Sequence, residues 1–191
     1  MTRLIQYASL RPTPWKNGGG ATTELAVAPA GAGFDDFDWR VSLATITEDG
    51  PFSAFPGIDR SLALVDGEAL LLDFGDTRIV LSPSDPIVEF AGEANVHATV
   101  NAQHTTDFNV MTRRGRYRHR IEPLLLRGTA ELPRRAGTTL VFLADGESLS
   151  LSSANERLAL VRYDLLVIEG EQAWTMESPQ ATVLVVDLIG Y

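Results

Sequence analysis

Hydrophobic residues along this chain occur in short runs that turn-forming residues separate. Val, Leu and Ile dominate the runs, which have the length of about four to eight residues that is typical of β-strands. Asp-Gly and Pro-Ser-Asp sequences interrupt them, and glycine accepts the positive φ that a tight hairpin needs. No long stretch keeps a helical period between helix caps. The pattern therefore predicts an all-β protein of sandwiches or small barrels.

An internal repeat divides the pattern into two copies. The segment LALVDGEALLL (62–72) resembles VFLADGESLSL (141–151), at an offset of 79 positions. The segment LSPSDPIVEFAGEA (81–94) resembles LVRYDLLVIEGEQA (160–173) at the same offset, with one residue lost towards its end. Each copy alone would have a thin core, so we expect the two copies to pack as one unit.

Two of the predicted strands carry polar residues on one face. The alternation in DWRVSLATI (38–46) places Arg40 and Ser42 on the face opposite large apolar residues. The strand DFNVMTR (107–113) places Asp107 and Asn109 on one face in the same way. These polar faces either meet water, as in an ordinary sandwich, or line a cavity.

The segment PWKNGGGATTEL (14–25) holds the only lysine of the chain, Lys16, beside three consecutive glycines. Successive glycine amides at 18–20 can form a concave anion nest, and the Lys16 ammonium adds a point charge. The alternative is a purely structural turn. A nucleotide-binding loop is not indicated, because the Lys-Ser/Thr ending of a phosphate loop is absent.

The loop GPFSAFPGIDR (50–60) contains two phenylalanines and ends in Asp59 and Arg60. One interpretation is a packed loop with a local Asp59–Arg60 salt bridge. The other is a rim that supplies Arg60 to an anionic group, because the guanidinium fork matches a carboxylate.

The segment RRGRYRHR (113–120) contains five arginines. A nucleic-acid patch is one reading of it, and a charged edge strand or a solvated connector is the other. We favour the second reading, because a net charge of -9 opposes the approach of a polyanion.

Composition narrows the chemistry further. The 191 residues contain no cysteine, which excludes disulfides and thiolate metal sites. The three histidines, His97, His104 and His119, form no His-x-His pair, so we expect no metal and no cofactor. No stretch has the length of a membrane span or the apolar core of a signal peptide, which predicts a cytoplasmic protein with no membrane partner.

The segments PWKNGGGATTEL, 39–68 and FAGE…DFNVMTRR (90–114) together resemble the HutD/Ves family. That resemblance implies an all-β bicupin fold, with two cupin-like halves at 1–120 and 121–191. Members of the family are often encoded with histidine-utilisation genes. Since the motif residues are polar in the first half and apolar in the second, we expect the first half to hold the pocket and the second to be structural.

From this we expect a metal-independent protein that binds a small carboxylate metabolite and acts as a sensor or governor of histidine utilisation. Candidate ligands are formylglutamate, formiminoglutamate and urocanate. Cations and glycine amides would hold the acid, polar groups would orient it, and Trp15 or Phe52 would cover its apolar stem. The expected ligand-binding residues are Trp15, Lys16, Asn17, Gly18, Gly19, Gly20, Glu24, Arg40, Ser42, Arg60, Asp107 and Asn109.

Two other functions stay open at this point. One is a metal-independent hydrolase or isomerase of the same pathway, with Asp107 or Glu24 as general base. The other is a purely structural interaction module without a ligand. The sequence identifies no catalytic residue beyond these two carboxylates, and it allows a homodimer.

Overall fold

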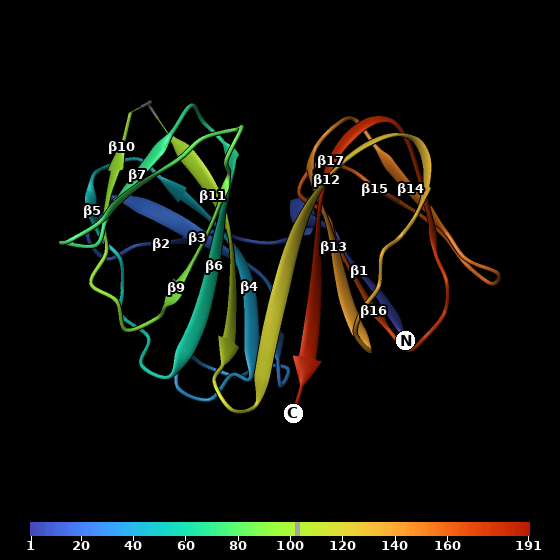
Figure 1. Cartoon of the computed structure of the whole chain (residues 1–191), viewed down its shortest axis with the longest axis horizontal. Helices are drawn as coiled ribbons and strands as arrows, with labels where there is room; N and C mark the ends of the chain where they lie inside the picture. Colours follow the sequence, from blue (N-terminus) through green and yellow to red (C-terminus); the bar gives the residue numbers. More distant parts are fainter. Residues whose placement is uncertain (102–103) are drawn as a thin grey trace. The chain divides into compact units, whose positions relative to one another are not determined.

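The computed structural model describes residues 1–101 and 104–191, and these residues form two compact units built of strands (Figure 1). The N-terminal unit comprises Leu10–Arg118, and the C-terminal unit combines Met1–Ser9 with His119–Tyr191. The only helix in the described part is a 3-10 turn, η1 (Tyr7–Ser9). No helix there is long and apolar enough to span a membrane.

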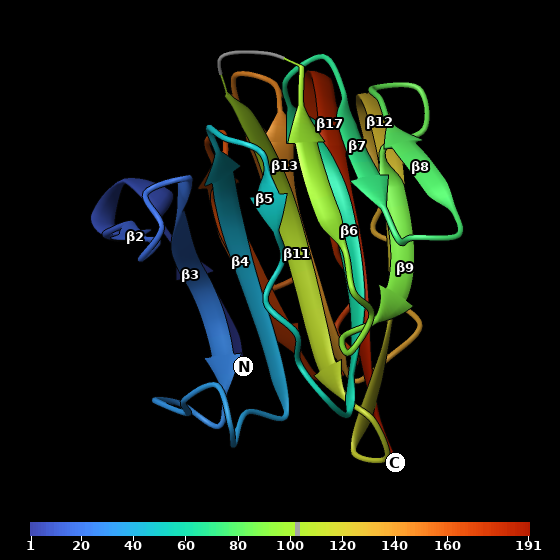
Figure 2. The same ribbon diagram turned by 90° about the vertical axis from the view of Figure 1, so that its left-hand side faces the viewer.

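The N-terminal unit contains a six-stranded and a four-stranded antiparallel sheet. The larger sheet has the order β2-β3-β4-β11-β6-β9, and the neighbouring strands β3, β4, β11 and β6 lie side by side in Figure 2. The smaller sheet has the order β5-β10-β7-β8. The strands are β2 (Thr13–Pro14), β3 (Gly20–Ala28), β4 (Trp39–Ile46), β5 (Gly50–Pro51), β6 (Ile58–Asp66), β7 (Leu70–Asp73), β8 (Arg78–Leu81), β9 (Ile87–Ala91), β10 (His97–Val100) and β11 (Thr105–Arg113).

The C-terminal unit is built on one seven-stranded sheet with the order β1-β16-β13-β17-β14-β15, in which β12 also pairs with β17. Strand β1 and the 3-10 turn η1 come from the first nine residues of the chain, and the other strands come from its second half. The strands are β1 (Thr2–Ile5), β12 (Tyr117–Glu131), β13 (Thr138–Asp145), β14 (Leu149–Ser152), β15 (Arg157–Leu160), β16 (Leu165–Glu169) and β17 (Thr175–Gly190).

The structure confirms the two copies that the sequence predicts. Strands β7 and β8 recur 79 positions later as β14 and β15, and β9 recurs 78 positions later as β16. The pairings recur as well, since β6 pairs with β9 and β11, while β13 pairs with β16 and β17. At the start of each first hairpin, Gly67 and Gly146 have φ of 108° and 120°, conformations that favour glycine.

The N-terminal strand β1 lies in the second copy. It pairs with β16, where Thr2 faces Ile168 and Ile5 faces Leu165. The backbone N–H of Tyr7 also donates to the Asp164 carboxylate, at 2.9 Å. The compact N-terminal unit therefore differs from the expected half 1–120 mainly because residues 1–9 belong to the C-terminal unit. The sequence repeat gives no sign of this exchange.

The interiors of the two copies differ at matching positions. Asp107 faces Leu64 across β6, and Val183 faces Leu143 across β13, so the two positions correspond through the repeat offset. By the same register Asn109 corresponds to Val185. Both valines belong to the buried hydrophobic cluster of the C-terminal unit. Hydrocarbon thus fills the second copy where the first carries polar groups.

Two arginines that follow β11 are held by acidic residues of the N-terminal unit. Arg114 forms ion pairs with Asp59 at 2.8 Å and with Glu93 at 2.9 Å. Arg116 forms an ion pair with Asp38 at 2.8 Å. These pairs tie the turn after β11 to neighbouring loops, which supports the predicted connector role of this segment over a nucleic-acid patch.

Candidate functional site

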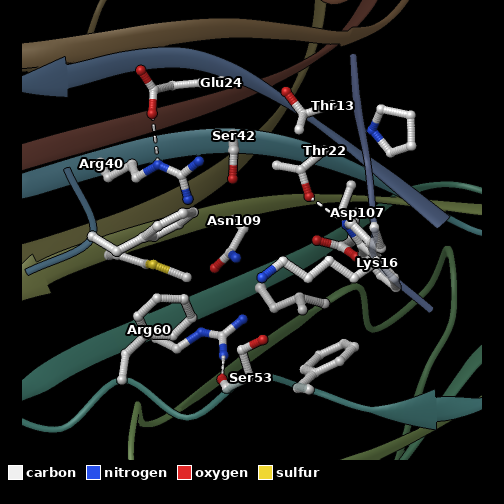
Figure 3. A pocket seen from close by; sticks show the side chains of 18 of the residues that line it. Thr13, Lys16, Thr22, Glu24, Arg40, Ser42, Ser53, Arg60, Asp107 and Asn109 are labelled. Atoms are coloured by element: carbon white, nitrogen blue, oxygen red, sulfur yellow. Dashed lines mark hydrogen bonds and ion pairs between the residues drawn. The ribbon is translucent and has the colours of Figure 1, made fainter. Parts of the chain in front are cut away.

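A pocket of about 840 Å³ lies against the six-stranded sheet of the N-terminal unit (Figure 3). Its wall is formed by β2, β3, β4, β5, β6 and β11, by the turn after β2 and by two loops. The lining residues are Thr13, Pro14, Trp15, Lys16, Asn17, Thr22, Glu24, Ala32, Gly33, Phe34, Arg40, Ser42, Ala44, Pro51, Phe52, Ser53, Phe55, Arg60, Leu62, Asp107, Asn109 and Met111.

Strand register explains why these polar residues gather. Side chains directly opposite one another on paired strands point to the same face of a sheet. Ser42 faces Glu24 on β3 and Asn109 on β11, so these three residues form one row across the sheet. In the next row Met111 lies between Arg40 and Arg60. The predicted polar face therefore lines a cavity.

Asp107 is a buried carboxyl group of the pocket that has no hydrogen-bond partner. Its side chain is 1% exposed, and neither carboxylate oxygen has a hydrogen-bond partner. Burial raises the pKa of Asp107 to about 7, and the nearby Arg60 guanidinium opposes this shift. At neutral pH the carboxyl group is therefore divided between its neutral and charged forms.

Arg60 supplies a buried cation to the same space. Its Cζ lies 5.0 Å from the ring centroid of Phe90 and 5.4 Å from those of Phe52 and Phe55, an aromatic surround that favours a cation. One terminal nitrogen donates to the carbonyl of Ser53 at 3.2 Å, while Nε is buried without a partner. Burial lowers the pKa of Arg60 to about 10, with Asp107 opposing and Arg40 adding to the shift.

The Asp59–Arg60 salt bridge of the first interpretation is not formed, because Asp59 pairs with Arg114. Arg60 points into the pocket instead, and Phe52 and Phe55 of the preceding loop line the same space. The loop therefore has the geometry of the second interpretation, a rim that surrounds Arg60.

Arg40 is held by an acid and an aromatic ring. Its Nε donates to Glu24 Oε2 at 2.8 Å, and its Cζ lies 4.6 Å from the ring centroid of Phe34. Phe34 is 60% exposed and comes from the loop between β3 and β4. Because Glu24 already accepts from Arg40, it is less suited than Asp107 to take a proton from a ligand.

Lys16 extends from the turn after β2 into the pocket (Figure 3). No carboxylate of the described residues forms an ion pair with its ammonium group. The preceding Trp15 is anchored, since its Nε1 donates to Thr22 Oγ1 at 2.8 Å and its backbone N–H donates to the Gly20 carbonyl at 2.9 Å. The turn thus fixes the backbone from which Lys16 projects and leaves its charge available.

The expected anion nest of glycine amides is not formed. The N–H of Gly18 donates to the Trp15 carbonyl at 3.1 Å, and the N–H of Gly19 donates to Asn17 Oδ1 at 3.2 Å. None of Gly18, Gly19 and Gly20 lines the pocket. Gly20 has a steric role instead, because a Cβ there would lie 2.5 Å from the Thr45 carbonyl oxygen and 2.9 Å from the Trp15 ring.

Comparison with known proteins identifies the family of this chain. The HutD family model matches residues 7–186. The chain belongs to the HutD family. A Pseudomonas putida protein described as an uncharacterized 21.2 kDa protein in the hutC 3' region is 35% identical over 189 residues, covering 98% of this chain and 97% of that protein. Protein Ves of Citrobacter koseri is 36% identical over 122 residues, covering 61% and 62% of the two chains.

Solved structures agree with this assignment. HutD from Pseudomonas fluorescens SBW25 superposes with a TM-score of 0.84 at 26% identity, and each chain is covered completely. Salicylate 1,2-dioxygenase from Pseudoaminobacter salicylatoxidans superposes with a TM-score of 0.68 at 9% identity, over 97% of this chain and 80% of that one. The second likeness shows the fold alone, and the chain is an all-β bicupin.

Nine of the twelve expected ligand-binding residues of this HutD-family chain line this pocket, and the three glycines do not. The expected ligand-binding residues did not include Phe34 or Met111, which also line the pocket. The Met111 position follows from the same alternation that gives Asp107 and Asn109, whereas Phe34 lies in a Pro/Gly-rich loop without periodicity. Among the described residues no three His, Asp or Glu side chains gather as metal ligands.

Gly20→Ala should destabilise the protein, because the new Cβ would overlap the Thr45 carbonyl and the Trp15 ring. Overpacking of this kind costs about 1–3 kcal/mol. Gly19→Ala is the matched control, since its nearest contact would be an ordinary 3.5 Å to Glu48, and it should stay within about 0.5 kcal/mol of wild type. Denaturant unfolding measures both, and equal losses of stability would contradict this account of the turn.

Asp107→Asn should stabilise the protein more at pH 8.5 than at pH 5. A carboxyl group whose pKa rises from about 3.9 to about 7 on folding destabilises the native state increasingly as pH rises between those values, and fully above them. Removing it should therefore change the free energy of unfolding by on the order of 3 kcal/mol more at pH 8.5 than at pH 5. Thermal unfolding across this range gives the difference.

The control for this comparison is Asp164→Asn in the C-terminal unit. Asp164 is also buried, but its carboxylate accepts hydrogen bonds from the backbone N–H groups of Tyr7 and Val161. This variant should melt below wild type at both pH values. If the free energies of unfolding of wild type and Asp107→Asn differ by the same amount at both pH values, Asp107 is not buried in its charged form.

Proposed function

We propose that the N-terminal unit binds a small carboxylate metabolite in the Asp107 pocket, and that the protein acts as a metal-independent sensor in histidine utilisation. One observation carries the proposal: a chain of net charge -9 concentrates cations in this pocket. Lys16, Arg40 and Arg60 face only two carboxylates, Glu24 and Asp107. The pocket is therefore positive, and more so when Asp107 is protonated.

The cations differ in how available they are to a ligand. Arg40 shares its charge with Glu24 through a 2.8 Å hydrogen bond. Lys16 has no such acid among the described residues, and Arg60 has a buried Nε without a partner. An acid that bridges Lys16 and Arg60 would gain two charge-assisted contacts, which are stronger than neutral hydrogen bonds.

Size and apolar lining also fit a metabolite. A cavity of about 840 Å³ lies in the range of roughly 300–1,000 Å³ that small-molecule sites occupy. Leu62, Met111 and the rings of Phe52 and Phe55 provide apolar surface beside the charged groups. A carboxylate with a short hydrocarbon stem matches this arrangement better than a sugar or a simple cation.

The link to histidine utilisation comes from the family. The relative from Pseudomonas putida is described by its place in the hutC 3' region, and the chain superposes completely on HutD from Pseudomonas fluorescens. Acids of histidine breakdown are therefore the first ligands to test: formylglutamate, formiminoglutamate and urocanate. Sensing of such an acid requires binding and no covalent step.

A second function, an enzyme acting on the same class of acid, has one observation in its favour. Asp107 has a pKa of about 7, near the value that suits a general base at neutral pH. Turnover of one of these acids by the pure protein, lost in Asp107→Asn, would favour catalysis over sensing. Binding without turnover would favour sensing.

Lys16→Met should weaken binding of the preferred acid by about ten- to a hundredfold, because a hydrogen bond to a charged group contributes roughly 1.5–3 kcal/mol. The variant should melt within a few degrees of wild type, since the Lys16 side chain is exposed and the turn is closed by backbone contacts. Isothermal titration calorimetry with the three acids measures the affinity.

Arg127→Met removes the same charge from an exposed position of the C-terminal unit, and it should leave the affinity unchanged. Equal affinities for Lys16→Met and wild type, with an acid that wild type binds, would show that the pocket does not use this ammonium. Unfolding of Lys16→Met would instead assign the residue an architectural role.

A further inference from the structure

Four buried polar atoms of the pocket lack hydrogen-bond partners. They are Arg60 Nε, Asn109 Oδ1 and both carboxylate oxygens of Asp107. When Asp107 is charged, one of these atoms is a donor and three are acceptors. Buried polar groups in folded proteins are nearly always paired, because an unpaired one loses its water without compensation. This cluster is therefore the least satisfied part of the pocket.

The neighbours of these acceptors on the pocket face are apolar except for Ser42, which faces Asn109 on β4 and forms no hydrogen bond to its Oδ1. Across the sheet, Asp107 faces Ala44 on β4, and Asn109 faces Leu62 on β6. The cation that acts electrostatically on Asp107 is Arg60, which donates a hydrogen bond to the Ser53 carbonyl. The donors for Asp107 and Asn109 must then come from outside the chain.

We infer that the ligand of this pocket carries, besides its carboxylate, an N–H group that donates to Asp107 and Asn109. This inference rests on the proposed function and narrows its ligand class to nitrogen-bearing acids such as acylamino, amidino or imidazolyl acids. The carboxylate would lie towards Lys16 and Arg60, and the nitrogen towards β11, where Asp107 and Asn109 point into the pocket (Figure 3).

The arrangement also explains why a purely cationic or a purely anionic ligand fits less well. A simple acid would satisfy Arg60 and Lys16 but would leave three acceptors buried and unpaired. An amine without a carboxylate would meet the excess of cations in the pocket. Only a molecule with both functions pairs the groups of both kinds.

The test uses two pairs of probes, and the second member of each pair lacks the N–H donor. One pair is N-formylglutamate and 2-(formyloxy)glutarate, in which an ester oxygen replaces the amide N–H. The other pair is urocanate and 3-(furan-2-yl)acrylate, in which a furan replaces the imidazole. Calorimetric titration should give wild type an affinity at least about tenfold higher for the N–H member of the pair it binds.

Asp107→Val and Asn109→Val identify the acceptors. Valine is chosen because Val183 and Val185 fill the corresponding positions of the C-terminal unit. Asp107→Val should lose the preference for the N–H member and keep its affinity for the member without the donor. Melting temperatures report whether each variant folds, and Asp107→Asn, which keeps the side-chain shape and one acceptor, should reduce the preference if the valine variant does not fold.

The preference should also grow from pH 5.5 to pH 8.5, because a charged Asp107 accepts an N–H better than a neutral one and its pKa is about 7. The other charged groups of the pocket are Arg60 on β6, Arg40 on β4, Glu24 on β3 and Lys16 in the turn. Both members of the formyl pair carry the same carboxylates. The effect of these charged groups on carboxylate binding is therefore the same for both members and does not change the preference.

The outcomes separate this inference from the proposed function. Equal wild-type affinities for both members of a pair, or a preference that survives in both Asp107→Val and Asn109→Val, would overturn the inference and leave the carboxylate site intact. Failure of all four probes to bind wild type would overturn the proposed function and this inference with it. A wild-type preference for the N–H member that is lost in Asp107→Val supports both the inference and the proposed function.

Discussion

The pocket is organised around one unfavourable feature, a carboxyl group buried in a β-unit without a hydrogen bond. Asp107 sits among apolar neighbours, and its charge is offset only by the nearby Arg60 guanidinium. Such a group costs stability in the free protein, and functional sites are where such costs are commonly retained. The aromatic surround of Arg60 and the Arg40–Glu24 pair are consistent with a site arranged in advance of its ligand.

The second copy of the repeat has the same strand framework without a buried, unpaired carboxyl group at the position of Asp107. Val183 and Val185 replace Asp107 and Asn109, and they join a cluster of buried leucines and valines. Hydrocarbon at these positions contributes burial free energy and needs no partner. The comparison indicates that the polar residues of the first copy are not required by the fold, and that one copy can stabilise itself while the other carries the pocket.

The sequence predicted the features that depend on period and repetition. Alternation in β4 and β11 placed Arg40, Ser42, Asp107 and Asn109 on one face, and the offset of 79 located the second copy. Contacts between segments distant in sequence were not predictable in this way. The pairing of β1 with β16 has no counterpart in the repeat, and the Phe34 contact depends on a loop without periodicity.

The glycine segment shows a different limit of sequence reasoning. Consecutive glycines are compatible both with an anion nest and with close packing, and composition does not distinguish the two. The structure does, because the amides of Gly18 and Gly19 are hydrogen-bonded within the turn and Gly20 gives the Trp15 ring room against β4. The single lysine is thus positioned by the turn, while the glycines remain outside the pocket.

Asp107 is buried without a hydrogen-bond partner, and the pH dependence of the chemical shift of its carboxyl carbon is a direct test of this. Selective 13C labelling of aspartate, with Asp107→Asn used to assign the resonance, allows this carbon to be followed by NMR from pH 4 to pH 9. We expect a midpoint near 7. A midpoint near 4, the value of a solvated aspartate, would contradict it.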